Sequence, residues 1–94
     1  MNIGHAIKTL RKKAEISQKD FSKLARISQT YLSEIENEKK LPSIPVLINI
    51  GDALNVPMFY LIWIASNEND VEDDKRDKYN YVYPMVTGIM DSLI

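Results

Sequence analysis

Hydrophobic residues recur at helical spacing along most of this chain. Ile3, Ile7 and Leu10 are separated by four and three residues, which predicts an amphipathic helix over residues 2–14. Ser43 is placed to cap a later helix, because a serine oxygen accepts an otherwise unpaired backbone N–H of the first turn. The apolar residues of that later helix have the same spacing: Val46, Leu47, Ile50, Ala53 and Leu54. The pattern predicts an all-α fold.

Between these two segments, the stretch from Ser17 to Asn37 predicts two short helices that meet at a sharp angle. Ser17 and Ser28 can each cap a helix, so the two helices are expected to start near Gln18 and Gln29. Asn37 is expected to end the second helix, since asparagine tolerates a left-handed backbone. One apolar cluster can lock the two helices together: Phe21, Leu24, Ala25, Ile27, Leu32 and Ile35.

A fifth helix, predicted over residues 57–66, is apolar on all sides. Phe59, Ile62 and Trp63 surround its axis, and a helix of that kind must be covered on several faces. A five-helix domain of this size covers only one face. The remaining cover must come from a partner subunit or from the segment after residue 66.

Residues 67–94 are therefore expected to form a helical extension that acts as a dimerisation element or as a lid over the fifth helix. Asp70 can cap it, with acidic residues in the first turn and basic residues one turn later. An apolar helix face follows: Tyr79, Val82, Tyr83, Val86, Met90 and Leu93.

Two features complicate the extension. Pro84 lacks an N–H and its ring clashes with the preceding turn, so a kink or a break is expected near that residue. The alternation of Tyr79 with later tyrosines also suits a strand, although the longer spacing favours a helix. If the helix forms, Tyr83, Val86 and Met90 are expected to pack against residues 57–64.

Charge is distributed unevenly. The formal net charge is −1, but residues 1–40 hold nine Lys and Arg against five acids, a balance of +4, and residues 41–94 hold −5. The positive charge coincides with the two-helix motif, as a phosphate-binding surface requires. No signal-peptide core is present, and the apolar run 56–65 is about half of what a membrane span needs. We expect a soluble, cytoplasmic, nucleoid-associated protein without membrane contact.

Candidate chemistry other than binding is sparse. The chain has no cysteine and His5 is its single histidine, so no metal site is expected. No serine has a base nearby in the sequence, and the Asp73–Asp74 pair lacks a hydrophobic pocket to tune it. We therefore expect neither an enzyme nor a cofactor.

A set of short motifs in order carries a resemblance to a known family. These are Leu10-Arg11-Lys12-Lys13, Ser17-Gln18, the run from Ile27 to Glu36 and Pro42-Ser43. Together they resemble the phage-repressor and Cro-type helix-turn-helix (XRE) family. The resemblance implies a five-helix lambda-repressor-like DNA-binding domain over residues 1–66, with the motif at about 17–37. It also implies a homodimer on a pseudo-palindromic double-stranded DNA operator, with half-sites about one helical turn apart.

The resemblance also assigns roles to residues. Helix 28–37 is expected to enter the major groove. The implied base contacts are Gln29, Thr30, Ser33 and Glu34, and the implied phosphate contacts are Gln18, Asn37, Lys39 and Lys40. Gln18 is expected to brace Gln29 as well, and Arg11 and Glu36 match a pair that forms a buried salt bridge. This sequence departs from the family at Arg26 and Glu38, where many members have glycine.

Two function classes follow from these observations. The first is a sequence-specific transcriptional regulator that acts as a dimeric repressor. The alternative keeps the fold as a protein-interaction module, for example an antitoxin whose fifth helix and extension bind a protein partner.

Overall fold

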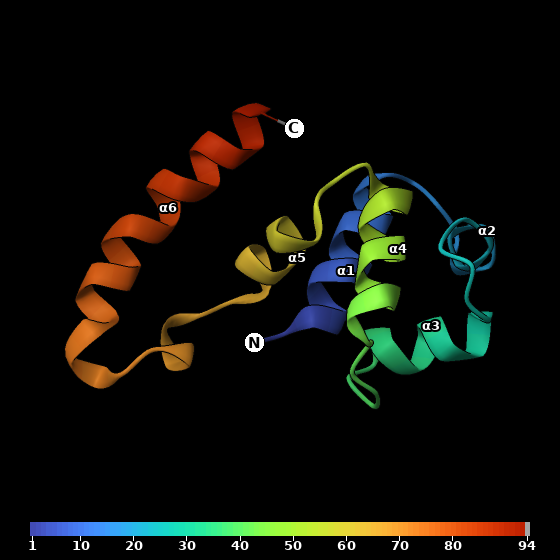
Figure 1. Cartoon of the computed structure of the whole chain (residues 1–94), viewed down its shortest axis with the longest axis horizontal. Coiled ribbons are helices and arrows are strands. Elements are labelled where there is room, and N and C mark those ends of the chain that lie inside the picture. Colours follow the sequence, from blue (N-terminus) through green and yellow to red (C-terminus); the bar gives the residue numbers. More distant parts are fainter. Residues whose placement is uncertain (94) are drawn as a thin grey trace.

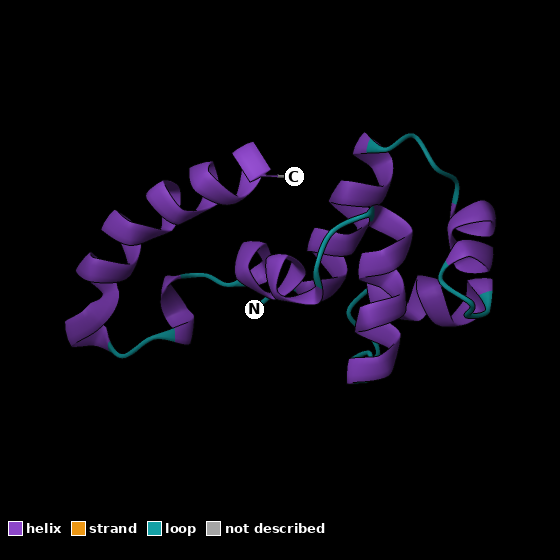
Figure 2. Cartoon of the chain, turned by 45° about the horizontal axis from the view of Figure 1, so that its top comes forward, coloured by secondary structure: helices purple, strands orange, loops and turns teal. Residues whose placement is uncertain are grey.

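The computed structural model describes residues 1–93, without the side chains of Glu68 and Leu93. All regular structure in that range is helical (Figure 2), which confirms the all-α prediction. The helices in chain order are α1 (Ile3–Lys13), α2 (Gln18–Leu24), α3 (Gln29–Glu36), α4 (Ile44–Leu54), α5 (Met58–Ala65) and α6 (Arg76–Leu93). The 3-10 turns η1 (Glu68–Asp70) and η2 (Asp73–Lys75) precede α6. Leu93, predicted on the apolar face of the extension, has a side chain outside the described set.

Serine caps define where three of the helices begin. Ser17, Ser28 and Ser43 each accept the backbone N–H of the residue three positions later, at distances between 3.0 and 3.4 Å. Each bond satisfies one donor that the first helical turn leaves unpaired, a contribution of about 1 kcal/mol per cap. The starts of α2, α3 and α4 are therefore encoded locally in the sequence.

Helices α1 to α5 enclose one core. Its fully buried side chains come from all five: Ile7, Phe21, Leu32, Ile35, Ile50 and Leu61. Leu24, which the sequence pattern placed in this core, is 58% exposed instead. The buried face of α2 is formed by Phe21, Ser22 and Ala25, and at 3.6 residues per turn Leu24 lies about 100° from its centre.

The turn after α3 differs from expectation at one residue. Asn37 has φ −92, so the prediction of a left-handed Asn37 was wrong, and the left-handed residue is Glu38, with φ 62. Arg26, in the turn between α2 and α3, has φ 58. Both turns therefore keep a conformation that favours glycine, although neither has one.

The extension also starts differently from its prediction. Asp70 does not cap α6, which begins six residues later at Arg76. The carboxylate of Asp70 instead accepts the N–H of Asn67 at 2.8 Å and pairs with the N-terminal ammonium of Met1 at 3.1 Å. Those bonds lower the pKa of Asp70, the Asn67 N–H having the larger effect. They hold the linker in 3-10 turns rather than in the predicted helix.

Once formed, α6 continues through Pro84 without the predicted break, as one bowed helix (Figure 1). Pro84 is exposed on α6, and a proline within a helix is a common cause of bending. The strand alternative for the tyrosine stretch is excluded, because Tyr79, Tyr81 and Tyr83 all lie within α6.

α6 packs on α5 through aromatic rings and side-chain hydrogen bonds. Trp63 stacks on Tyr83 with ring centroids 5.2 Å apart, and its Nε1 donates to Thr87 at 2.8 Å. Tyr83 donates to the backbone oxygen of Ile64 at 3.3 Å, and Tyr60 donates to Asp91. The bond to Asp91 raises the pKa of Tyr60 to about 12, since an ionised phenol cannot donate it.

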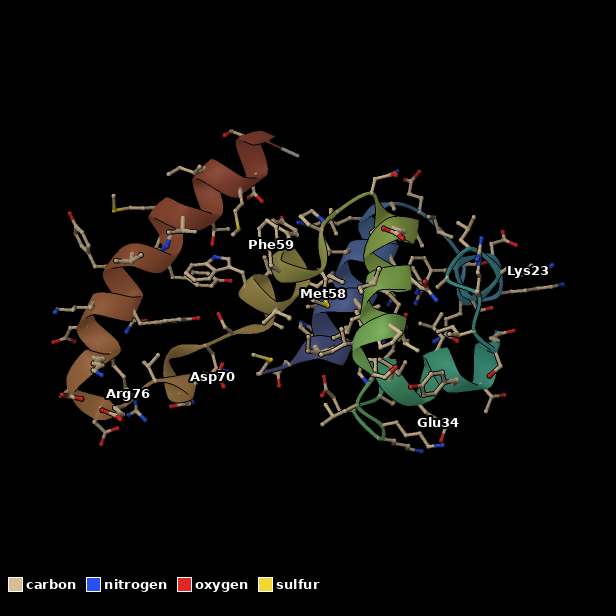
Figure 3. The ribbon with its side chains drawn as sticks, in the orientation of Figure 1. Lys23, Glu34, Met58, Phe59, Asp70 and Arg76 are labelled. Carbon is tan, nitrogen blue, oxygen red and sulfur yellow. The ribbon has the colours of Figure 1, made fainter. Side chains whose placement is uncertain are left out.

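The other residues predicted to pack in this region lie in different environments. Val86 and Met90 are half-buried on α6. Ile62 is half-buried against the core of the five-helix body, whereas Phe59 is 58% exposed near the start of α5 (Figure 3). Of these three α5 residues, Trp63 makes a ring contact and a side-chain hydrogen bond with α6.

No single helix among the described residues is both long enough and apolar enough to cross a membrane. α4 and α5 reach the required length and composition only when taken together, and they are bent by 97°.

Candidate nucleic-acid interface

A shallow depression of about 320 Å³ lies between the N-terminal end of α2 and the outer edge of α3. The residues that line it were all predicted DNA contacts: Gln18, Gln29, Thr30, Ser33 and Glu34. Gln29 and Thr30 are exposed, and Ser33 and Glu34 are half-buried. The structure thus brings the four predicted base contacts and one predicted phosphate contact onto a single surface.

A buried ion pair supports this surface from below. Arg11 of α1 donates to both carboxylate oxygens of Glu36, at 2.8 and 3.0 Å, and to the backbone oxygen of Ile16 at 2.8 Å. The hydrogen bond to Glu36 raises the pKa of Arg11 further. Both residues are buried, at 7% and 5% exposure, so the pair fixes α3 against α1.

The same carboxylate also positions Gln18. Its Nε2 donates to Oε1 of Glu36 at 3.0 Å, which assigns the orientation of this amide. Gln18 therefore lines the depression while one of its amide hydrogens bonds to the buried carboxylate of Glu36. The expectation that Gln18 braces Gln29 stays a prediction.

The loop after α3 holds the remaining predicted phosphate contacts. Asn37, Lys39 and Lys40 are all exposed. The side-chain amide of Asn37 donates to the hydroxyl of Ser33 at 3.3 Å. The backbone N–H groups of Lys39 and Lys40 donate to the backbone oxygen of Glu34, at 2.8 and 3.3 Å. These bonds hold the loop beside the outer edge of α3.

Glu34 is the one acid among the predicted base contacts, and it has a cation beside it. The Nζ of Lys40 lies 3.3 Å from a carboxylate oxygen of Glu34, which projects from α3 (Figure 3). The side chain of Glu34 is 31% exposed and that of Lys40 is 56% exposed. The pair is therefore worth at most about 1 kcal/mol and opens easily. Its main effect is to reduce the repulsion that a free carboxylate exerts on DNA phosphates.

Sequence reasoning missed the role of Glu38. Its Oε1 accepts the backbone N–H of His5 at 3.0 Å, in the first turn of α1, where Asn2 provides no side-chain cap. The approach is close because residue 4 is glycine: a Cβ on Gly4 would lie 2.0 Å from the backbone oxygen of Ile35. Gly4 inside an amphipathic helix was the signal for this contact, since glycine there is otherwise unfavourable.

The angle between α2 and α3, the exposed polar edge of α3 and the lysines beside it define a helix-turn-helix DNA-binding domain. The chain belongs to the helix-turn-helix family, whose sequence profile matches residues 7–61.

Two proteins of Bacillus phage phi105 are similar to this chain. The first is an immunity repressor protein, 26% identical over 80 residues, covering 85% of this chain and 53% of the repressor. The second is the ImmF control region 10 kDa protein, 38% identical over 56 residues, covering 60% of this chain and 62% of that protein. The chain thus spans between half and two thirds of the length of these relatives.

A solved structure has the same fold. The clp gene regulator ClgR from Corynebacterium glutamicum aligns with a TM-score of 0.66 and 25% identity, over 68% of each chain. With the family match and the phage relatives, it confirms the prediction of a phage-repressor-type (XRE) fold. The chain therefore contains a helix-turn-helix domain of the phage-repressor class.

Proposed function

We propose that this protein is a sequence-specific repressor that binds an operator as a homodimer, with α3 of each copy in the major groove. The observation that supports this most directly is the depression lined by Gln18, Gln29, Thr30, Ser33 and Glu34. Polar side chains of this size, exposed along one helix edge, can pair with base edges in the major groove. In the cell, such a repressor acts in the cytoplasm, at the nucleoid.

Each exposed group has a specific proposed role. Gln29 presents an amide that can bond adenine N6 and N7 together, and Thr30 presents a hydroxyl and a methyl group. Gln18, Asn37 and Lys39 contact phosphates and set the register of α3 along the groove. These contacts supply binding that is independent of sequence, whereas the edge of α3 supplies specificity.

Glu34 and Lys40 act as a coupled pair in this proposal. While they remain in contact, Lys40 neutralises the carboxylate and adds little attraction for phosphate. When α3 meets a cytosine, Glu34 accepts from its N4 amino group, and Lys40 is released toward the backbone. The pair therefore favours cytosine opposite Glu34 over bases that offer only acceptors there.

Selection of the purified protein on random duplex DNA tests the proposal, with binding followed against salt concentration. We expect an enriched inverted repeat and a log–log salt slope of about −0.9 for each phosphate contacted. Gln29→Ala and Thr30→Ala should each lower affinity for the selected operator by about 1–3 kcal/mol and relax specificity at one base. Binding that is weak and uniform in all sequences would refute the proposal.

Two matched variants separate recognition from general effects. Thr9→Ala makes the same change as Thr30→Ala at an exposed position on α1 and should leave operator affinity unchanged. Lys39→Gln should reduce the salt slope by about one phosphate. Lys75→Gln is its control: it removes an exposed cation near the start of α6 and should leave the salt slope unchanged. Equal losses from both lysine variants would show that the attraction comes from overall charge.

A further inference from the structure

α6 is apolar on two opposite faces. Its inner face holds the aromatic rings against α5, and its outer face exposes large hydrophobic side chains. On that outer face Tyr81 is 73% exposed, Val82 42%, Met85 56% and Ile89 60%. These positions follow helical spacing, so they form one continuous stripe, which we call the outer stripe. A helix that is apolar on opposite faces is stable when both faces are covered.

We propose that the outer stripe of α6 pairs with the same stripe of a second copy of this chain, with the two helices antiparallel. The inference rests on the proposed function, because it names the interface of the proposed dimer. Antiparallel pairing of identical helices satisfies a two-fold axis, in which the same patch faces itself.

Charge along the stripe selects that orientation. Within α6, Lys78 lies at the N-terminal end of the stripe, one turn before Val82, and it is exposed. The other end of the stripe reaches Ser92, in the last turn of the helix. The carbonyl groups of a last turn carry a partial negative charge that favours a nearby cation. Antiparallel pairing places each Lys78 against the last turn of the other α6, whereas parallel pairing places two lysines side by side.

The exposed area indicates how strong the pairing is. Large side chains bury about 150–250 Å² each, so four that are about half exposed offer roughly 400 Å² per copy. With the stem of Lys78 and the flanking backbone, the total for two copies approaches ~1,000 Å², the lower end for a specific interface. We therefore expect a dimer with a dissociation constant on the order of micromolar in the absence of DNA.

This pairing changes the expected operator. Along the longest axis of the molecule, 41 Å in extent, α6 lies at one end and α3 toward the other (Figure 1). Half-sites one turn apart need recognition helices 34–36 Å apart, each about 17 Å from the two-fold axis. An axis beyond the outer stripe lies farther than that from α3. The next spacing that presents both half-sites on one side of the duplex is two turns, about 70 Å.

Sedimentation equilibrium without DNA tests the interface. Wild type should show a monomer–dimer equilibrium, and Ile89→Glu should raise the dissociation constant at least about 100-fold, by placing two acids in an apolar contact. Ile48→Glu is the matched control, because Ile48 on α4 is also an exposed isoleucine, at 46%. Trp63 fluorescence should be the same in wild type and Ile89→Glu, since Trp63 packs on the opposite face of α6.

Two results would refute the proposed α6 interface. The first is a wild type that stays monomeric up to about 1 mM, the range of very weak association. The second is a dimer that Ile48→Glu dissociates and Ile89→Glu does not. The assay contains no DNA, so either result leaves operator binding unaffected. Conversely, Gln29→Ala should weaken operator binding and relax specificity at one base while leaving the dissociation constant of the dimer unchanged. Failure of the interface and failure of the proposed function are thus distinguishable.

Cross-linking tests the orientation, because the natural chain has no cysteine. Met85 lies midway between Lys78 and Ser92, so Met85→Cys should form a disulfide with its own copy under mild oxidation. Lys78→Cys should cross-link to Ser92→Cys in a mixture and not to itself. A Lys78→Cys homodimer would reverse the orientation, and selected half-sites one turn apart would overturn the predicted spacing.

Discussion

Replacing Glu38 separates two opposing contributions to stability at one position. Its backbone has φ 62, a conformation that costs a non-glycine residue about 1 kcal/mol relative to glycine. Its carboxylate accepts the His5 N–H at 3.0 Å at the start of α1. The side chain therefore stabilises the protein while the backbone conformation destabilises it, and three substitutions distinguish the two effects.

The expected free energies follow from these two contributions. Glu38→Ala keeps the unfavourable φ and loses the cap, worth about 1 kcal/mol, with a further 0.3–1 kcal/mol for a negative charge at a helix N-terminus. It should therefore lower the free energy of unfolding by roughly 1–2 kcal/mol. Glu38→Gly loses the same cap but regains about 1 kcal/mol from the backbone, so it should lie within ~1 kcal/mol of wild type. Glu38→Gln keeps an acceptor oxygen and should lose only the charge contribution.

Urea denaturation followed by far-UV circular dichroism measures the series. A difference of about 1 kcal/mol between the glycine and alanine variants corresponds to a shift of roughly 0.3–1 M in the midpoint, for slopes of 1–3 kcal/mol/M. Glu15 provides the control, since it has φ 58 and an exposed side chain. Glu15→Gly should stabilise the protein by up to about 1 kcal/mol, because glycine adopts a positive φ without the cost that a side chain imposes. If Glu38→Ala is as stable as wild type, the cap contributes nothing and the reasoning is refuted.

The remaining predictions concern the core and the contact between α5 and α6. Gly4→Ala should destabilise the protein by about 1–3 kcal/mol or more, because its Cβ meets a backbone oxygen. Gly88→Ala, which has open space around it, should stabilise the protein by up to ~1 kcal/mol. Thermal unfolding compares the two variants. Glu36→Ala should cost about 3–5 kcal/mol in urea denaturation by leaving Arg11 buried without its partner, and an effect under ~1 kcal/mol would show that α3 is held by its apolar residues. The bond from Tyr60 to Asp91 should stabilise the packing of α6 fully below pH 10, the ordinary pKa of the phenol, and lose that contribution as pH rises through about 12; Tyr60→Phe should remove this pH dependence from Trp63 fluorescence.

The fold could be predicted where signals in the sequence are local. Ser17, Ser28 and Ser43 cap helices at the predicted positions, because a cap depends on residues within one turn. Leu24 shows the limit of periodicity: in a seven-residue helix, two residues a turn apart do not define the centre of the buried face. The start of α6 was missed because Asp70 is engaged by the distant Met1 ammonium.

At the proposed DNA-binding surface, the residues that lie together could be predicted from the sequence, whereas their hydrogen-bond and ion-pair partners could not. The depression contains the residues that the resemblance indicated, since their spacing on α3 fixes which edge they share. The contacts of Glu34, Glu36 and Glu38 depend on where α1 and the following loop lie, and that is set by tertiary packing. The carboxylate of Glu38 was therefore interpreted as a departure from the family, when it caps another helix.

The acids of the recognition segment also bear on why the protein should act as a dimer. Glu36 and Glu38 are satisfied by Arg11 and by the His5 N–H, so they repel phosphates less than their number suggests. Glu34 is neutralised by its ion pair with Lys40. Of the two lysines in the loop, Lys39 is therefore the one that can contact a phosphate without first leaving Glu34. Few phosphates can then be neutralised by one copy, and affinity that depends on phosphate contacts is correspondingly modest. Joining two copies doubles the contacts and raises the effective concentration of the second copy at its half-site, so the strength of repression should follow the strength of pairing.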